Sequence, residues 1–244
     1  MQKLISYPLS IIYYLCFGFF LVIFHPIQWI CFNVFGYQAH KKSVDYLNFF
    51  LVRCTNLLGT SYQFENTEFI PKNVPVIFVA NHQSLYDIVA IIWYLRDYHC
   101  KFVSKKELGN GIPSVSYNLN HGGSVLIDRK DPKQAIPLIK GLSEYIENNT
   151  RSAVIFPEGT RSKTGSPKLF AVNGLKMLYK FAPDAYFLPI TINNSWKMTK
   201  FGQFPLGLGN KLEFQIHEPM KISEYKFEEI FEKTEKVITE NIKK

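Results

Sequence analysis

Short apolar runs alternate with segments of helical periodicity along most of the chain. Runs with the length and composition of buried strands cover residues 75–80, 101–104, 124–127, 153–156 and 186–192. Apolar positions recur at helical spacing in residues 44–59, 87–95, 132–147, 173–181 and 226–244. Residues 212–217 alternate apolar with polar positions, and we interpret them as an edge strand. Strands that alternate with helices predict an α/β fold, with a mixed, mainly parallel sheet flanked by helices.

The N-terminal segment has a different pattern. No Asp, Glu, Lys or Arg occurs in residues 4–40, although lysines flank this segment on both sides. Its longer apolar arm, residues 9–24, is shorter than the ~20 residues that a spanning helix needs, and Pro26 separates it from a second arm. We therefore predict a membrane-associated helical hairpin, broken near Pro26, that enters one leaflet. A single span and a buried pair of core helices are the alternatives, whereas a signal peptide fits poorly.

The change in composition near Lys41 suggests two parts, a membrane-associated helical segment at residues 1–60 and an α/β domain at residues 61–244. Hydrophobic residues make up 47% of the chain, which excludes a disordered or low-complexity protein. The 28 basic residues exceed the 20 acidic ones, and this surplus suits an anionic membrane, a phosphorylated substrate or nucleic acid. The four cysteines form no CxxC pair and predict no metal site.

A histidine follows the apolar run at residues 75–80, and open α/β sheets bind ligands at the carboxyl ends of their strands. His82 and Asp87 are five positions apart, so one continuous helix would place them on different faces. If a helix begins near Ser84, His82 can turn back toward Asp87, whose carboxylate would then fix the imidazole tautomer. A capping box made by Ser84 and Asp87 is the alternative. These residues alone favour neither interpretation.

Two other predicted strands also end in charged residues. Residues 124–127 lead to Arg129, which could bind an anion, although an exposed pair with Asp128 is the simpler interpretation. The loop after residues 153–156 contains Glu158, Gly159, Thr160 and Arg161. Gly159 allows a backbone to approach a ligand closely, and the guanidinium of Arg161 suits phosphate. A plain hydrophilic turn is the alternative for this loop.

Taken together, the strand ends resemble the 1-acyl-sn-glycerol-3-phosphate (lysophosphatidate) acyltransferase family over about half of the chain. The matching motifs are His82 to Asp87 (H-x4-D), Gly123 to Arg129 (G-x-x-[FL]-x-x-R), Phe156 to Ser162 (FPEGTRS) and Leu188 to Ile192 (a proline-bearing apolar strand). Lys105 lies in a segment that resembles the family's K-x-E-L segment. The joint match outweighs the simpler interpretations above. One departure is that Ala171 follows Phe170 where many members carry a lysine, and Lys168 is out of register.

The resemblance implies a glycerophospholipid acyltransferase fold and a 1-acylglycerol-3-phosphate O-acyltransferase. Such an enzyme moves a fatty acyl group from acyl-CoA or acyl-carrier protein to the sn-2 hydroxyl of 1-acyl-glycerol 3-phosphate, which gives phosphatidic acid. His82 would be the general base, oriented by Asp87. The residues expected to bind substrate are Lys105, Arg129, Glu158, Gly159, Thr160 and Arg161. We expect no metal and no cofactor beyond the thioester co-substrate.

The expected partners are lipids of an anionic leaflet, lysophosphatidic acid and the thioester donor, and not nucleic acid, because no nucleic-acid-binding motif occurs. The catalytic domain is expected to face the cytoplasm. Two alternatives belong to other substrate or function classes. One is acylation of another acceptor, such as a lysophospholipid, glycerol 3-phosphate or a lyso-aminolipid. The other is a non-catalytic lipid-binding membrane protein that keeps the fold.

Overall fold

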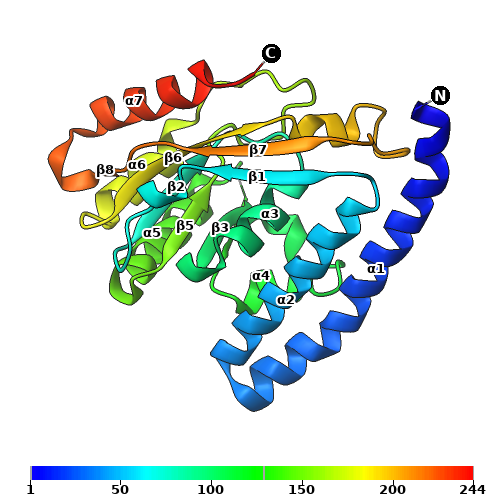
Figure 1. The fold of residues 1–244 in the computed structure, drawn as a ribbon. Helices are drawn as coiled ribbons and strands as arrows, with labels where there is room; N and C mark the ends of the chain where they lie inside the picture. Colours follow the sequence, from blue (N-terminus) through cyan, green and yellow to red (C-terminus); the bar gives the residue numbers. More distant parts are fainter. Residues whose placement is uncertain (1, 129, 244) are drawn as a thin grey trace.

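An eight-stranded sheet lies at the centre of the protein in the computed structural model, which describes residues 2–128 and 130–243 (Figure 1). The strands are β1 (Ser61–Glu65), β2 (Val76–Ala80), β3 (Cys100–Lys105), β4 (Val125–Ile127), β5 (Ser152–Ile155), β6 (Tyr186–Asn193), β7 (Lys211–Ile216) and β8 (Met220–Lys221). Their order across the sheet is β1-β7-β6-β2-β5-β3-β4, and β8 pairs with β6. The strands from β2 to β6 run parallel to one another, whereas β7 and β8 are antiparallel to β6. The predicted mixed, mainly parallel sheet is confirmed.

One expectation about the sheet was wrong. Residues 212–217 form β7, but this strand lies between β1 and β6 and not at an edge. Its alternating pattern arises because Leu212, Phe214 and Ile216 are fully buried while the residues between them are less covered. An alternating apolar and polar pattern therefore indicates that one face of a strand is more buried than the other, and it does not indicate whether the strand lies at the edge of the sheet. The strand at that edge of the sheet is β1, which was not predicted because its sequence has few apolar residues and is only partly buried.

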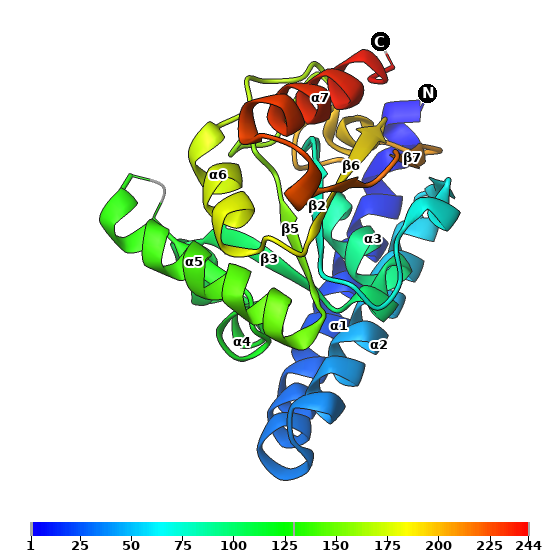
Figure 2. The ribbon, with the colours of Figure 1, turned by 90° about the vertical axis from the view of Figure 1, so that its left-hand side faces the viewer.

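Helices cover both faces of the sheet (Figure 2). On one face lie α2 (Tyr37–Asn56) and α3 (Tyr86–Tyr94), and on the other lie α5 (Pro132–Asn149), α6 (Val172–Phe181) and α7 (Phe227–Glu240). Successive residues of β2 pack alternately into the two cores, with Phe78 on the α3 side and Ile77 and Val79 on the α5 side. Every residue of β2 is buried, which explains why this strand reads as a continuous apolar run.

The first helix, α1 (Gln2–Phe35), runs unbroken through Pro26, so the predicted break there was wrong. The chain turns instead at Gly36, directly before α2, and this helical hairpin extends away from the sheet (Figure 1). Gly36 has φ of 81°, in the left-handed region that glycine adopts without steric cost. A proline removes one helical hydrogen bond, and here that loss does not end the helix. By length and composition α1 is the one helix among the described residues that could cross a membrane.

Side chains of α1 join it to the domain from one end to the other. Near its start, Gln2 Nε2 donates to the carbonyl oxygen of Leu208 (3.1 Å), and near its end Asn33 Nδ2 donates to the hydroxyl of Tyr117 (3.0 Å) in the short helix α4 (Val115–His121). Tyr13 is buried against the α3 core. The exposed large hydrophobic side chains of α1 include Leu4, Ile11, Leu15, Phe19, Val22 and Ile30. Successive members of this set are three or four residues apart, or seven or eight, so they form an apolar stripe along the exposed face of α1.

Candidate active site

The loops after β2 and β5 meet because these strands are parallel neighbours and both end at the same edge of the sheet. Two hydrogen bonds join the loops through His82. Its backbone nitrogen donates to Glu158 Oε1 (2.9 Å), and its carbonyl oxygen accepts from the backbone nitrogen of Ser162 (2.7 Å). The structure thus brings the first and third sequence motifs into direct contact.

His82 and Asp87 form the expected pair, with 2.9 Å between His82 Nδ1 and Asp87 Oδ2. The side chain of Asp87 is completely buried. Its Oδ2 also accepts from the backbone nitrogens of Gln83 (2.8 Å) and Ser84 (2.9 Å), and its Oδ1 accepts from Ser84 Oγ (3.2 Å). One carboxylate therefore orders the first turn of α3 and holds the imidazole. The same carboxylate makes the capping contacts and the contact with the imidazole, while the catalytic role of the pair stays a prediction.

The imidazole of His82 is fixed on a second side by an aromatic ring. It stacks on Phe156, the first residue after β5, with 4.1 Å between ring centroids and 18° between planes. Because a carboxylate can only accept, Nδ1 is the donor in this contact, and in the neutral form of the ring the lone pair lies on Nε2. No described residue hydrogen-bonds to Nε2, and the side chain of His82 is 12% exposed. The ring is thus arranged to take a proton from an incoming hydroxyl.

Glu158 connects three segments of the site. Besides His82, it accepts from the backbone nitrogen of Lys168 through Oε2 (3.2 Å). Burial raises the pKa of Glu158 to about 7, and the two backbone donors and the Lys168 charge oppose this rise. The family resemblance placed Glu158 among the residues expected to bind substrate. Among the described residues its carboxylate instead holds the two catalytic loops together, while a role in substrate binding stays a prediction.

Lys168 completes the loop that contains Thr160 and Arg161. Its Nζ donates to Thr160 Oγ1 (2.8 Å) and to the carbonyl oxygen of Arg161 (2.9 Å), so Lys168 fixes this loop although it is out of register with the family's lysine. Gly159 has φ of 68°, a conformation that disfavours other residues at this turn. The side chain of Arg161 is exposed and has no protein partner among the described residues. Its guanidinium is available to a ligand.

For two of the predicted substrate-binding residues the structure shows no contact with the His82–Asp87 pair. Lys105 lies exposed at the carboxyl end of β3, the correct edge of the sheet, but its side chain has no hydrogen bond or ion pair with described residues. Arg129 lies outside the described residues. The assignments of Lys105 and Arg129 to substrate binding stay predictions.

Sequence reasoning missed two residues that flank His82. Asn81 bonds to both backbone groups of Ile192 (2.8 and 2.6 Å), and Gln83 accepts from the backbone nitrogen of Ser195 (3.1 Å) and donates to the carbonyl oxygen of Gly165 (3.3 Å). Both side chains are buried. Their position directly after a buried strand was the available signal, because a buried amide needs partners. They anchor the His82 loop to the end of β6.

The chain matches the family model described as Acyltransferase over residues 61–193. It is 40% identical over 127 residues to a 1-acyl-sn-glycerol-3-phosphate acyltransferase of Helicobacter pylori, covering 49% of this chain and 51% of that protein. It is 36% identical over 110 residues to a protein of the same name from Cocos nucifera, covering 45% of this chain and 34% of that protein. The chain thus spans about half or less of the length of these curated relatives.

A solved structure has the same fold over almost the full length. It is the crystal structure of the 1-acyl-sn-glycerophosphate (LPA) acyltransferase, PlsC, from Thermotoga maritima. The TM-score is 0.79 at 24% sequence identity, and the match covers 99% of this chain and 96% of the other. At this identity the likeness concerns the fold, including the long first helix, while the chemistry rests on the site itself.

Proposed function

The chain belongs to the acyltransferase family, and from this premise we propose that it moves a fatty acyl group from a thioester to the sn-2 hydroxyl of 1-acyl-glycerol 3-phosphate, giving phosphatidic acid. The observation that carries the proposal is the His82–Asp87 pair, 2.9 Å apart, tied through Glu158 to the loop that presents Arg161. The names of the curated relatives support the acceptor.

The pair supports direct transfer by general-base catalysis. His82 Nε2 takes the proton of the acceptor hydroxyl while the hydroxyl oxygen attacks the thioester carbonyl carbon. Asp87 stabilises the imidazolium that forms, and its buried position keeps the interaction strong. When the tetrahedral intermediate collapses, the C–S bond breaks and the thiolate takes the proton back from His82. No covalent enzyme intermediate is required.

The charge of the loops supports recognition of the acceptor phosphate. Arg161 offers a planar fork of donors suited to phosphate, and Lys168 fixes the backbone that carries it. In the proposal Arg129 and Lys105 add positive charge from neighbouring strand ends, as the family resemblance implies. The donor is acyl-CoA or acyl-carrier protein, and the reaction needs no further cofactor.

Membrane association is proposed to occur through the exposed apolar stripe of α1. An α-helix of 34 residues is about 51 Å long, which exceeds the thickness of a hydrocarbon core. However, α1 contacts the domain near Gln2, Ser10, Leu21 and Asn33, and a helix that crosses the bilayer would lose most of these contacts. We therefore favour a monotopic protein whose N-terminus and catalytic domain share one side, proposed to be the cytoplasmic one.

The test is an acyl-transfer assay with the purified full chain, labelled lysophosphatidic acid and a panel of acyl-CoA and acyl-carrier-protein thioesters. The proposal predicts labelled phosphatidic acid, and at least ~10²-fold slower formation by a folded His82→Ala variant. Glycerol 3-phosphate, other lysophospholipids and lyso-aminolipids serve as competing acceptors. A faster reaction with one of these would replace the proposed acceptor, and equal turnover by His82→Ala would remove His82 from the chemistry.

A further inference from the structure

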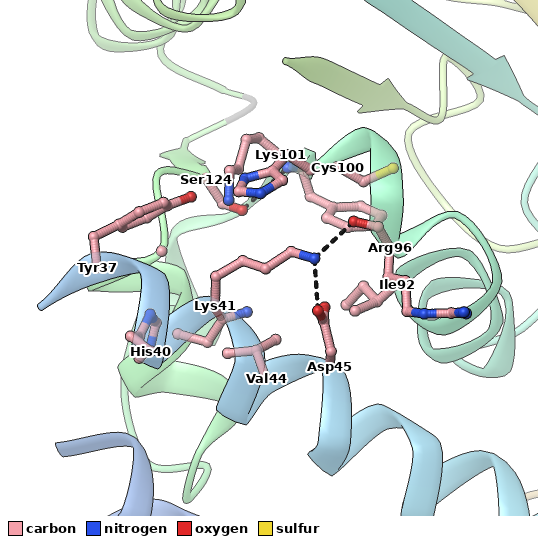
Figure 3. A pocket seen from close by; sticks show the side chains of 14 residues that line it. Tyr37, His40, Lys41, Val44, Asp45, Ile92, Arg96, Cys100, Lys101 and Ser124 are labelled. Carbon is pink, nitrogen blue, oxygen red and sulfur yellow. Dashed lines mark hydrogen bonds and ion pairs between the residues drawn. The ribbon is translucent and has the colours of Figure 1, made fainter. Parts of the chain in front are cut away.

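A second cluster of basic and polar side chains lies at the opposite edge of the sheet from His82. It surrounds a cavity of about 30 Å³ (Figure 3). The lining residues come from the first turns of α2, from α3 and the turn after it, from the start of β3, and from α4 and the loop after it. Cys100, the first residue of β3, pairs with Ser152, the first residue of β5, so this is the amino edge of the parallel strands. The acyl-transfer site described above follows their carboxyl ends.

The cavity has more positive than negative charge. Lys41, Arg96 and Lys101 line it, and Asp45 is the one carboxylate in its lining among the described residues. Asp45 is already engaged, because Lys41 Nζ lies 2.6 Å from its Oδ2, and Figure 3 shows this pair with the bond from Lys41 to the carbonyl oxygen of Arg96. Arg96 and Lys101 form no ion pair with Asp45, although its charge also acts on them at longer range.

Lys101 is the least compensated of these groups. It is 6% exposed, and its ammonium forms no ion pair with a carboxylate among the described residues. Its Nζ lies 5.2 Å from the ring centroid of Tyr37, and the guanidinium of Arg151 lies 4.7 Å from the same centroid. Burial lowers the pKa of Lys101, the neighbouring Tyr37 hydroxyl opposes this shift, and the charge of Arg151 adds to it. A buried ammonium beside a second cation is unfavourable unless an anion accompanies it.

Several hydrogen-bonding atoms around the cavity also lack partners. His40 is completely buried and neither of its ring nitrogens has a partner among the described residues, and the same holds for the Tyr37 hydroxyl and His99 Nδ1. Burial and nearby cations, including Lys101, lower the pKa of both His40 and His99 to about 4, so both rings are neutral and each offers one N–H donor. Buried donors of this kind normally have partners.

We propose that this cavity is an oxyanion site for a phosphate group, with Lys101 supplying charge and the Tyr37 hydroxyl and His40 supplying hydrogen bonds. The cavity volume of about 30 Å³, roughly that of two water molecules, admits one or two oxygens of a phosphate group and excludes an acyl chain. The phosphate belongs either to a lipid headgroup or to free phosphate. The inference does not depend on the acyl-transfer reaction, because the site lies at the other sheet edge.

The test uses the purified full chain in neutral detergent and phosphate-free buffer. Sodium phosphate is added at constant ionic strength, with sodium chloride as the reference, and binding is followed by titration calorimetry and by the melting temperature. A ligand that binds the native state raises the melting temperature in a saturable manner. We expect saturable binding by the wild type, and Lys101→Met should weaken it by at least about tenfold, since a charge-assisted contact is lost.

Two controls separate this site from other phosphate contacts. Arg161→Gln removes a guanidinium of the candidate active site, and Lys140→Met removes a half-exposed lysine on α5. Both should bind phosphate at this cavity as the wild type does. Lys101→Met should also be at least as stable as the wild type without phosphate, because it removes an unpaired buried charge. Tyr37→Phe, which keeps the aromatic ring, is the second variant if Lys101→Met fails to fold, and should weaken binding severalfold.

Vesicles identify the source of the phosphate group. If the source is a headgroup, phosphatidylcholine vesicles with phosphatidic acid will bind the wild type better than Lys101→Met, while vesicles of phosphatidylcholine alone will not distinguish them. If the source is free phosphate, the Lys101→Met substitution will weaken the binding of sodium phosphate in calorimetry but will not change binding to either vesicle type. Both results support the site. Equal responses of Lys101→Met and Lys140→Met to sodium phosphate and to both vesicle types would overturn it, as would a wild type that responds to phosphate no more than to chloride.

Discussion

Asp87→Asn should separate the catalytic role of Asp87 from its structural role. Three donors converge on Oδ2 of the carboxylate, namely His82 Nδ1 and the backbone nitrogens of Gln83 and Ser84, whereas Oδ1 accepts from Ser84 Oγ alone. An asparagine whose oxygen takes the Oδ2 position keeps all three donors satisfied, and its amide can donate to the Ser84 hydroxyl. The substitution therefore removes the negative charge while the hydrogen-bond geometry is retained.

The two costs of this change differ in size. Replacing a charged acceptor with a neutral one weakens each retained hydrogen bond, by about 1–2 kcal/mol in total after the desolvation of the carboxylate is subtracted. In a chain of this length that lowers the melting temperature by a few degrees, roughly 2–4 °C per kcal/mol. Loss of the imidazolium's counter-charge should slow acyl transfer by about 10²–10⁴-fold, or ~3–5 kcal/mol of barrier. A stability of about 5–15 kcal/mol leaves the variant folded, so unfolding cannot account for such a rate loss.

The assay measures kcat at saturating lysophosphatidic acid together with the melting temperature. Ser84→Ala is the matched control, because it removes the bond to Oδ1 and the contact of Ser84 Oγ with the Tyr86 backbone nitrogen (3.2 Å) but leaves the charge. It should lose about 1 kcal/mol of stability, as other cap deletions do, with kcat within about threefold of the wild type. If Asp87→Asn and Ser84→Ala lose the same activity, or if Asp87→Asn is as active as the wild type, the proposed role of Asp87 is wrong.

Three further outcomes are expected. Burial raises the pKa of Glu158 from 4.5 to about 7, so between these pH values the folded protein keeps a proton that the unfolded chain releases. The free energy of unfolding therefore falls as pH rises through this window. Glu158→Gln should flatten this fall in urea unfolding measured at several pH values, and parallel pH curves for the two proteins would contradict the prediction. Lys168→Met should raise the acceptor KM severalfold more than the donor KM, since the Arg161 loop loses its tether; equal changes in both would exclude this role. Phe19→Glu, on the exposed stripe of α1, should release protein from vesicles in a flotation assay, whereas Ile136→Glu on the exposed face of α5 should not. Equal flotation of the two variants would refute the proposed membrane face.

The sequence was informative about the sheet wherever a strand is buried on both faces. β2 and β5 were predicted within one residue because each is a continuous apolar run, and the polar residues after them had to lie at one edge of the sheet. The contact between His82 and Asp87 depended on a helix that begins near Ser84, and these residues alone left a simple capping box as an equal alternative. β1 could not be predicted in this way, because its residues pack on one face and gain order mainly by pairing with β7.

The contacts of the loop after β5 were beyond the sequence for a different reason. Glu158 and Lys168 are ten positions apart in a hydrophilic stretch with no periodicity, and their hydrogen bonds depend on where β2 places His82. The turn of the helical hairpin was misplaced because proline was given more weight than glycine. A helix can lose one hydrogen bond at Pro26 and continue, but the positive φ of Gly36 is incompatible with helix continuation.

In the proposed membrane arrangement, the packing of α1 would link the membrane to the candidate active site. Tyr13 of α1 and Tyr86 of α3 are both 1% exposed, and their ring centroids lie 6.2 Å apart. Tyr86 is the residue before Asp87 and begins the helical turn that this carboxylate caps. The apolar helix therefore supports, from behind, the turn that orients His82. If the acceptor is the proposed lysophosphatidic acid, such a fixed offset would let its acyl chain stay in the leaflet while the reacting hydroxyl is held at a constant height above it.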